Sequence, residues 1–369
     1  MAGRLIVFKI GSSTLVDAEG KLDRPFIRSL CDQIVRLRDA GDRVVVVSSG
    51  ASAAGRDVLG FSERPSDIAT LQACASVGQT ALTEAYAEVL RERGIACGQV
   101  LLTRRDVVDR DGYLNARNTL TRLLELGAVP VVNENDTVSV AEFTFGDNDM
   151  LGAIVSGLVD ADLYIIMSDV DGLYTANPQR DPTAELIDVV TEVDHNISAM
   201  AGDSASSFGT GGMSSKVRAA RAMMAAGIPT VICEGRRKGV LLDVAAGKKV
   251  GTLFQPQSDG GHEMGRKLWI GLAEVVRGTL VLDEGAARAV LGNGASILPV
   301  GVTRIEGDFA SGEVVNVTSP AGDLIGRGVV RYSSEDMGRV RGLKLDVIAR
   351  FLGDDAAVPA IHRDELLVF

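Results

Sequence analysis

The sequence predicts an open, mostly parallel α/β sheet sandwiched by helices, followed by a small β-rich domain. Apolar runs alternate with amphipathic stretches over about the first 250 residues, which is typical of strand–helix units. The runs are short and nearly continuous in Val, Ile and Leu, as in strands that are buried on both faces. After Gly251–Phe254 the sequence pattern changes, and short candidate strands separated by glycine turns follow.

The expected elements follow in chain order. The strands of the larger domain are Leu5–Ile10, Arg43–Ser48, Ile95–Leu102, Val129–Asn133, Leu163–Met167 and Thr230–Cys233. The helices between them are Pro25–Ala40, Ile68–Arg93, Asn115–Leu126, Asp149–Val159 and Ser214–Ala226. In the smaller domain we expect strands at Gly278–Leu282, Ser296–Val300, Gly312–Thr318 and Asp323–Tyr332, and helices at Glu284–Leu291 and Met337–Phe351. The predicted division is a larger domain over residues 1–255, a linker over 256–276, a smaller domain over 277–353 and a tail over 354–369.

Composition narrows the function classes. The chain has 369 residues and a net charge of −11, whereas proteins that bind nucleic acid or anionic membranes usually present a basic surface. The four cysteines are scattered without a CxxC pair, which is typical of reduced thiols rather than disulfides or a zinc site. No apolar stretch approaches the roughly 18 residues of a membrane span, and none resembles a signal peptide. We therefore expect a cytoplasmic protein with no membrane contact.

Two small-residue segments follow the first two strands. Lys9 lies near the end of the first strand, two residues before Gly11, and a buried lysine needs an anionic partner that a glycine turn can approach. The segment from Ser48 to Gly55 leaves room for a ligand and offers hydroxyl and amide groups at the carboxyl end of a strand. The first segment has the alternative of a lysine that points to solvent. The second has the alternative of a tightly packed turn.

Two clusters of Asn and Asp residues, Asn133–Asp136 and Gly146–Asp149, are denser than turns require. A carboxylate there suits an ammonium group on a substrate. Asp149 alone has the alternative of capping a helix.

Two further segments suit a nucleotide. The loop from Ser168 to Thr175 follows a strand and either lies against the nucleotide or forms a β-turn. The segment Gly209–Lys216 places glycines and hydroxyls at a helix start, which is a phosphate cradle, with Lys216 one turn inside. It departs from a Walker A motif, because Ser215 and not glycine precedes Lys216.

Together these segments predict phosphoryl transfer from ATP to a small carboxylate-bearing molecule. Lys9 and Lys216 can neutralise phosphate charge, while carboxylates and amides can hold Mg²⁺ and the acceptor. The three histidines, at positions 195, 262 and 362, lie outside the segments. A carboxylate acceptor is already deprotonated at neutral pH and needs no base.

In this order the segments resemble the amino acid kinase family, and Ala201–Ser204 adds to the match. The C-terminal part is similar to a PUA domain, with the pattern on Gly294, Leu298, Gly301, Val302, Gly307, Phe309, Gly312 and Val314. The resemblance implies ATP-dependent phosphorylation of the γ-carboxylate of L-glutamate, the first step of proline biosynthesis. It further implies Mg²⁺ as cofactor, proline as feedback inhibitor, and a homodimer or homotetramer.

The resemblance also implies residue roles. Lys9 and Lys216 stabilise the transferring phosphoryl group, and Asp149 orients them. Glutamate is bound by Ser49, Asp136 and Asn148, with Asp136 meeting the ammonium group. The nucleotide contacts Lys9, Ser168, Asp169, Thr210, Gly211, Gly212, Met213, Ser214, Ser215 and Lys216. Ser168–Asp169 stands where the family commonly has Thr-Asp, which keeps the hydroxyl. No residue is assigned to the metal.

Two alternatives stay open. One is a kinase of the same fold for aspartate, N-acetylglutamate or uridylate, although an ammonium partner in Asn133–Asp136 disfavours the last two. The other is an RNA-binding protein acting through the PUA-like domain, where residues 277–369 hold ten basic and thirteen acidic side chains, net −3. A local basic patch of Arg331, Arg339, Arg341 and Lys344 keeps the second alternative open.

The expected product, an acyl phosphate, hydrolyses readily. We therefore expect a transient contact with glutamyl phosphate reductase, which would receive the product without releasing it to water.

Overall fold

The computed structural model of the chain forms two compact units, Met1–Asp259 and Gly260–Phe369. It describes residues 3–103, 106–107, 110–139, 148–178, 180–193, 197, 200, 212–256, 276–293, 295–353 and 357–368. Most of the linker expected at 256–276 lies outside these residues. Among the helices that are described, none is long and apolar enough to span a membrane.

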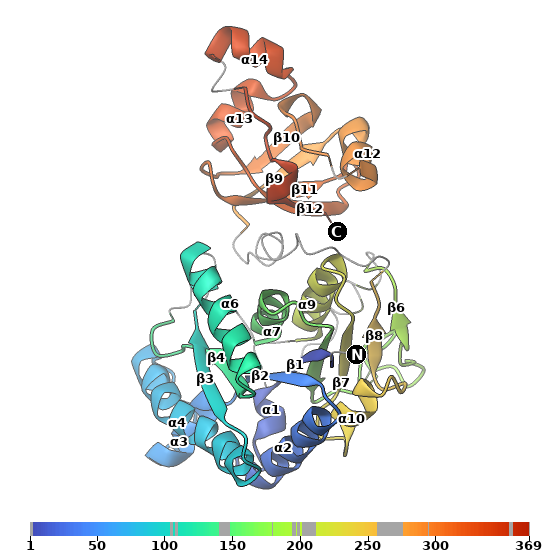
Figure 1. Cartoon of the computed structure of the whole chain (residues 1–369). Helices are drawn as coiled ribbons and strands as arrows, with labels where there is room; N and C mark the ends of the chain where they lie inside the picture. The colour runs from blue at the N-terminus through green and yellow to red at the C-terminus, as the bar shows by residue number, and fades with distance from the viewer. Residues whose placement is uncertain are drawn as a thin grey trace. The chain divides into compact units, whose positions relative to one another are not determined.

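A mostly parallel sheet lies at the centre of the first unit (Figure 1). Its strands are β1 (Leu5–Ile10), β2 (Arg43–Ser48), β3 (Cys97–Leu102), β4 (Val129–Glu134), β5 (Leu163–Ser168), β6 (Val189–Val190), β7 (Thr230–Glu234) and β8 (Thr252–Phe254). They lie in the order β3-β4-β2-β1-β5-β7-β8-β6, and only β7 and β8 are antiparallel neighbours. The chain moves from β1 to β2 on one side and later returns to β5 on the other. The carboxyl ends of β1 and β5 therefore form the switch point where open α/β sheets bind ligands.

Helices cover both faces of this sheet (Figure 1). One face carries α2 (Arg24–Asp39), α4 (Ile68–Glu92) and α10 (Val240–Ala245), and the other carries α6 (Arg110–Glu125), α7 (Asn148–Leu158) and α9 (Met213–Ala225). Two shorter helices, α1 (Ser12–Leu15) and α3 (Ala51–Leu59), follow β1 and β2 directly. The predicted sandwich of a mostly parallel sheet between helices is confirmed.

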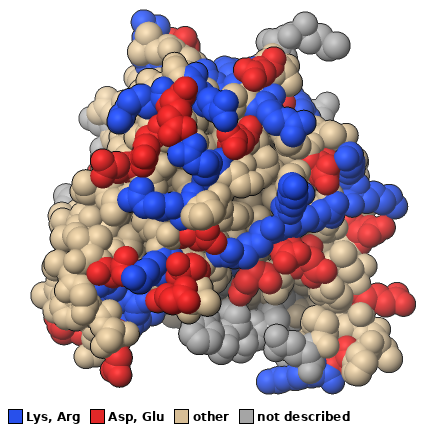
Figure 2. Space-filling model, turned by 90° about the horizontal axis from the view of Figure 1, so that it is seen from below, with Lys and Arg blue, Asp and Glu red and all other residues tan. Residues whose placement is uncertain are grey.

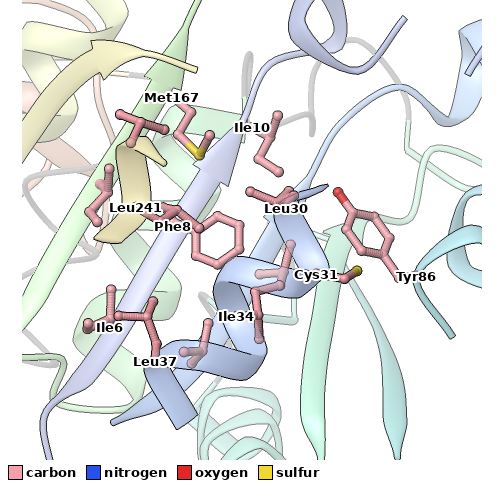
Figure 3. Packing of buried hydrophobic residues seen from close by; sticks show 14 of the residues in the cluster. Ile6, Phe8, Ile10, Leu30, Cys31, Ile34, Leu37, Tyr86, Met167 and Leu241 are labelled. Atoms are coloured by element: carbon pink, nitrogen blue, oxygen red, sulfur yellow. The ribbon is translucent and has the colours of Figure 1, made fainter. Parts of the chain in front are cut away.

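Phe8 shows how β1 orients its side chains. It is fully buried among side chains such as Leu30, Met167 and Leu241, on the face that α2 covers (Figure 3). Burial of a side chain of this size stabilises the fold by roughly 1.5–3 kcal/mol. Because side chains alternate along a strand, Lys9 points to the opposite face, which α7 covers.

Two glycines bring α3 and α4 into backbone contact. A Cβ atom on Gly55 would lie 1.7 Å from the carbonyl oxygen of Cys74, and one on Gly78 would lie 1.8 Å from that of Ala51. Neither position can carry a larger side chain without moving a helix. This packing holds α4 directly against the start of α3.

The second unit has a five-stranded sheet in the order β10-β9-β11-β12-β13. The strands are β9 (Gly278–Leu282), β10 (Val302–Gly307), β11 (Val314–Thr318), β12 (Leu324–Val329) and β13 (Leu366–Val368), and the helices are α12 (Glu284–Asn293), α13 (Ser334–Val340) and α14 (Leu345–Leu352). Its core contains side chains from all five strands. Leu280, Val315 and Leu366 are almost fully buried in it. The predicted small β-rich domain is confirmed.

Two elements predicted in this unit are wrong. The strand predicted at Ser296–Val300 is a short 3₁₀ turn at Pro299–Gly301, and the strand of this region is β10. Proline lacks the N–H that a sheet needs at this point. The single helix predicted over Met337–Phe351 is instead α13 and α14, because Gly342 adopts a φ of +77° that ends the first helix.

The last residues belong to the C-terminal domain, contrary to the tail predicted over 354–369. Within the described residues 357–368, β13 pairs with β12, and Ile361 bridges to Ile297. Ala360 and Ile361 are fully buried. These contacts make the end of the chain an edge strand and part of the core.

Candidate active site

Lys9, Asp149 and Lys216 form one buried cluster at the carboxyl end of the sheet. Nζ of Lys9 lies 2.5 Å from Oδ1 of Asp149, and Nζ of Lys216 lies 2.9 Å from Oδ2. Asp149 is fully buried, and the two lysines are only 5% and 6% exposed. Buried charges are tolerated when they are paired, and here one carboxylate bridges two ammonium groups. The cluster carries one net positive charge, which suits a phosphoryl group.

The electrostatics favour an ionised carboxylate. Burial alone would raise the pKa of Asp149, but the charges and hydrogen bonds of Lys9 and Lys216 outweigh it and hold that pKa below its ordinary value. Asp149 therefore stays negative at neutral pH and keeps both lysines in place.

Three elements deliver the cluster. Lys9 comes from β1, and Asp149 lies in the first turn of α7, whose backbone carbonyl at Asp149 accepts a 2.7 Å hydrogen bond from the hydroxyl of Tyr164 on β5. Lys216 lies in the first turn of α9, which begins after Gly212. The neighbouring Ser215 donates to Oδ2 of Asp149 at 3.2 Å. Sequence segments more than 200 residues apart thus meet at one carboxylate.

A second group of polar side chains lies beside the cluster, since Asn148 directly precedes Asp149. Nδ2 of Asn148 donates to Oγ of Ser49 at 2.7 Å and to Oδ1 of Asn133 at 2.8 Å. Ser49 precedes Gly50, whose φ of +96° allows the turn from β2 into α3. The structure therefore joins the predicted residues Ser49 and Asn148.

Asp136 is a carboxylate without a counter-charge among the described residues. It follows β4 in the loop after Glu134 and is partly buried. Burial raises its pKa to about 6. An ammonium group placed beside Asp136 would supply the missing charge and lower that pKa.

Most of the residues predicted to contact the nucleotide lie at the carboxyl end of β5 or at the start of α9. Ser168 is buried and donates to Oδ1 of the exposed Asp169 at 3.0 Å. The first turn of α9, which follows Gly212, directs backbone N–H groups out of the N-terminal end of the helix, as in an anion site. Met213 and Ser215 are buried, whereas Ser214 is exposed. Thr210 and Gly211 lie outside the described residues, as do 146–147 and 201–204.

Sequence reasoning did not find Gln79. This α4 residue is 7% exposed and accepts a hydrogen bond from Nδ2 of Asn133 at 2.8 Å. Asn133 belonged to a predicted cluster but was given no role. The sequence contains one indication of a role for Gln79, which is that a polar residue lies on the apolar face of a helix.

The charged surface offers little to a polyanion. In the proposed basic patch, Arg331 pairs with Glu365 at 3.0 Å, and Arg339 pairs with both Glu335 and Asp336. These ion pairs disfavour RNA binding through the patch in the C-terminal domain. On another face of the protein, seen from below in Figure 2, basic and acidic side chains are interleaved as well.

Comparison with known proteins agrees with the geometry. The model of the amino acid kinase family matches residues 4–234, and that of the PUA domain matches residues 278–352. Glutamate 5-kinases are similar along nearly the whole chain. The one from Moorella thermoacetica is 44% identical, covering 99% of this chain and 96% of its own, and that from Gloeobacter violaceus is 45% identical, covering 98% of each.

A solved structure shares the fold of the first unit. Carbamate kinase from Giardia lamblia bound to AMP-PNP superposes with a TM-score of 0.50 at 18% identity, covering 69% of this chain and 99% of the other. The chain therefore belongs to the amino acid kinase family, within it to the glutamate 5-kinases, and carries a C-terminal PUA domain.

Proposed function

We propose that the protein transfers the γ-phosphoryl group of ATP to the γ-carboxylate of L-glutamate, giving γ-glutamyl phosphate and ADP as the first step of proline biosynthesis. The observation that carries the proposal is the pair of lysines on Asp149, directly beside the Ser49–Asn148 pair. The similarity to glutamate 5-kinases over nearly the whole chain supports the choice of substrate.

In this reaction a γ-carboxylate oxygen of glutamate attacks the γ-phosphorus. The new P–O bond forms while the bond from that phosphorus to the β,γ-bridging oxygen breaks, and ADP leaves with the electron pair. Lys9 and Lys216 offset the charge that spreads over the transferring group. Asp149 keeps the two ammonium groups from separating. No side chain has to remove a proton, because the attacking group is already an anion.

Glutamate is held by its α-amino and α-carboxylate groups. Asp136, which has no counter-charge among the described residues, receives the α-ammonium. The hydroxyl of Ser49, which already accepts a hydrogen bond from Asn148, is left to donate to a carboxylate. A partly buried carboxylate that lacks a cation favours glutamate over acceptors without an ammonium group.

ATP lies against Ser168, Asp169 and the start of α9 in this proposal, with phosphate oxygens on the N–H groups that follow Gly212. Mg²⁺ accompanies the nucleotide, and when bound it neutralises phosphate charge. The described residues contain no group of three His, Cys, Asp or Glu side chains that would form an all-protein metal cage. This suits a cation held mainly by phosphates and water, and the exposed carboxylate of Asp169 would be available to it as a protein ligand.

The remaining proposals concern the setting of the reaction. We place the enzyme in the cytoplasm as a homodimer or homotetramer that proline inhibits. A transient complex with glutamyl phosphate reductase would protect the acyl phosphate from water. Product that escaped fully to bulk solvent in the presence of the reductase would contradict that complex.

The test of the activity is an ADP-release assay with glutamate, aspartate, N-acetylglutamate and UMP, with hydroxylamine present to trap an acyl phosphate as its hydroxamate. We expect hydroxamate with glutamate alone. Lys216→Ala should abolish turnover while the protein stays folded. Turnover with another acceptor in preference to glutamate, or wild-type turnover in Lys216→Ala, would contradict the proposal.

A further inference from the structure

A row of five polar side chains connects the proposed glutamate site to the outer edge of the sheet. We call it the amide relay, and it consists of Asn148, Asn133, Gln79, Thr83 and Gln99. Its successive donor–acceptor distances are 2.8, 2.8, 3.1 and 2.8 Å. The residues come from α7, β4, α4 and β3, so the relay crosses four elements.

Every link in the amide relay donates in the same direction. Nδ2 of Asn148 donates to Asn133, Nδ2 of Asn133 donates to Gln79, Nε2 of Gln79 donates to Thr83, and the Thr83 hydroxyl donates to Gln99. Hydrogen bonds in such a chain polarise and strengthen one another. The donor direction is therefore the same from Asn148 to Gln99, and the link from Asn133 to Gln79 is the one that bears directly on Asn133.

At the substrate end this direction has a chemical consequence. With its Nδ2 engaged by Asn133 and Ser49, the Asn148 amide turns its carbonyl oxygen Oδ1 the other way, and no described residue donates to that oxygen. Oγ of Ser49 accepts from Asn148, so its hydrogen remains for another partner. The site thus presents one acceptor and one donor side by side. These are the complements of an ammonium group and a carboxylate.

Gln79 is the link that a substitution can test most cleanly. It is buried, does not belong to the loops around the site, and is the residue after Gly78, where α4 meets the backbone of α3. Its Oε1 takes the N–H of an Asn133 side chain that is only 2% exposed. Without Gln79 that buried N–H loses its acceptor, and the Asn133 amide keeps only the two hydrogen bonds that its Oδ1 accepts, from Asn148 and from the backbone N–H of Glu134.

We propose that Gln79 is a positioning residue for the acceptor amino acid, acting through Asn133 to point the carbonyl oxygen of Asn148 at the substrate's α-ammonium. The inference rests on the proposed function and deepens it, since it assigns part of the preference for α-amino acids to a residue that does not touch the substrate.

The experiment compares Gln79→Leu with Gln79→Glu in the full-length protein by steady-state assay. Loss of one buried hydrogen bond corresponds to about a tenfold rise in KM for glutamate in Gln79→Leu, with KM for ATP and kcat within about twofold of wild type. Gln79→Glu keeps an acceptor oxygen for Asn133 and should recover most of that loss. Gln33→Leu is the matched control: Gln33 is also buried on a helix but bonds the backbone of Leu241, so its KM for glutamate should stay unchanged.

A double-mutant cycle separates positioning from a general loss of packing. In an Asn148→Ala background, Gln79→Leu should produce no further rise in KM, because the group that it orients is gone. If Gln79→Leu does not fold, Thr83→Val breaks the next link with little change of shape and should raise KM for glutamate about threefold.

Unchanged KM in the folded variants, equal losses for glutamate and ATP, or additive effects in the cycle would overturn the inference while leaving the proposed function intact. Absence of glutamate turnover in the wild-type protein would instead remove the proposed function, and the inference with it.

Discussion

The ammonium group of Lys9 lies 2.5 Å from Oδ1 of Asp149, and both side chains are almost entirely buried. The second oxygen of Asp149 holds Lys216 in the same way. This arrangement prepares two positive charges for a phosphoryl group before any ligand arrives, because the carboxylate supplies the charge balance that the interior requires.

The first prediction concerns Asp149→Asn, which keeps the shape but leaves two buried lysines without a counter-charge. We expect a loss of about 3–5 kcal/mol in the free energy of unfolding and a fall in kcat of at least about a hundredfold. Thermal denaturation and the hydroxamate assay measure the two effects. Asp160→Asn is the control, since it removes an exposed pair with Arg117 and should cost less than about 1 kcal/mol. Equal melting temperatures for the two variants would show that Asp149 is not the anchor.

The second prediction concerns pH. Burial raises the pKa of Asp136 to about 6, so its proton binds as pH falls below that value. Protonation removes the charge that meets the ammonium, and kcat/KM for glutamate should therefore fall on the acid side of pH 6. The profile of Asp136→Asn should lack this step and lie about ten- to a hundredfold lower near pH 7. An unaltered profile in that variant would assign the step elsewhere.

The third prediction concerns stability at the same residue. A carboxyl whose pKa is raised on folding binds a proton more tightly in the folded chain, so its contribution favours folding below about pH 4 and is lost as pH rises through 6. Asp136→Asn removes that penalty and should raise the melting temperature of the unliganded protein at pH 7, although it impairs glutamate use. Scanning calorimetry at pH 7 and pH 4 tests the sign. A lower melting temperature at pH 7 would contradict it.

The fourth prediction concerns Gly78→Ala. The added methyl group would lie 1.8 Å from the backbone oxygen of Ala51, so α3 or α4 must shift. We expect a cost of about 1–3 kcal/mol in stability together with a higher KM for glutamate, since Gln79 moves with the helix. Gly338→Ala in α13 has open space around it and should be neutral or slightly stabilising. Equal behaviour of the two alanine variants would contradict the close packing.

The fifth prediction concerns the end of the chain. Removal of residues 354–369 takes away β13 and the buried side chains of Ala360 and Ile361. The C-terminal domain should then melt earlier and become sensitive to limited proteolysis, because its sheet loses an edge and its core loses apolar contacts. A truncated chain with the wild-type melting profile would restore the interpretation of this segment as a tail.

The sequence predicted the first unit well because its strands are simple to recognise. The runs Leu5–Ile10 and Arg43–Ser48 are buried on both faces, so they read as continuous apolar segments with defined ends. The same physics predicted that side chains following such strands would share an edge of the sheet. Lys9 was found on that basis, whereas Asn148 was found because it lies in a dense cluster of Asn and Asp residues, and its role came from the family resemblance.

The C-terminal domain was harder because its signals are weaker. β10 has mostly exposed residues, and its polar composition resembles a loop. The break between α13 and α14 depends on one glycine within an otherwise helical pattern. The amide relay was out of reach for a different reason. Gln79 and Asn133 are 54 positions apart, and the local sequence around either residue does not predict that their side chains form a hydrogen bond.

The burial of α7 has a consequence for how this enzyme can change. Every residue from Asp149 to Leu158 is buried, so the helix is packed against its neighbours along its whole length. Asn148 and Asp149 are consecutive, and the anchors for acceptor and donor are therefore joined by one peptide unit, about 3.8 Å between Cα atoms. A new acceptor cannot be accommodated by stretching that link. Evolution or design of another specificity would have to reshape the surrounding turns, since any change in α7 affects the binding of the phosphoryl donor and the acceptor at once.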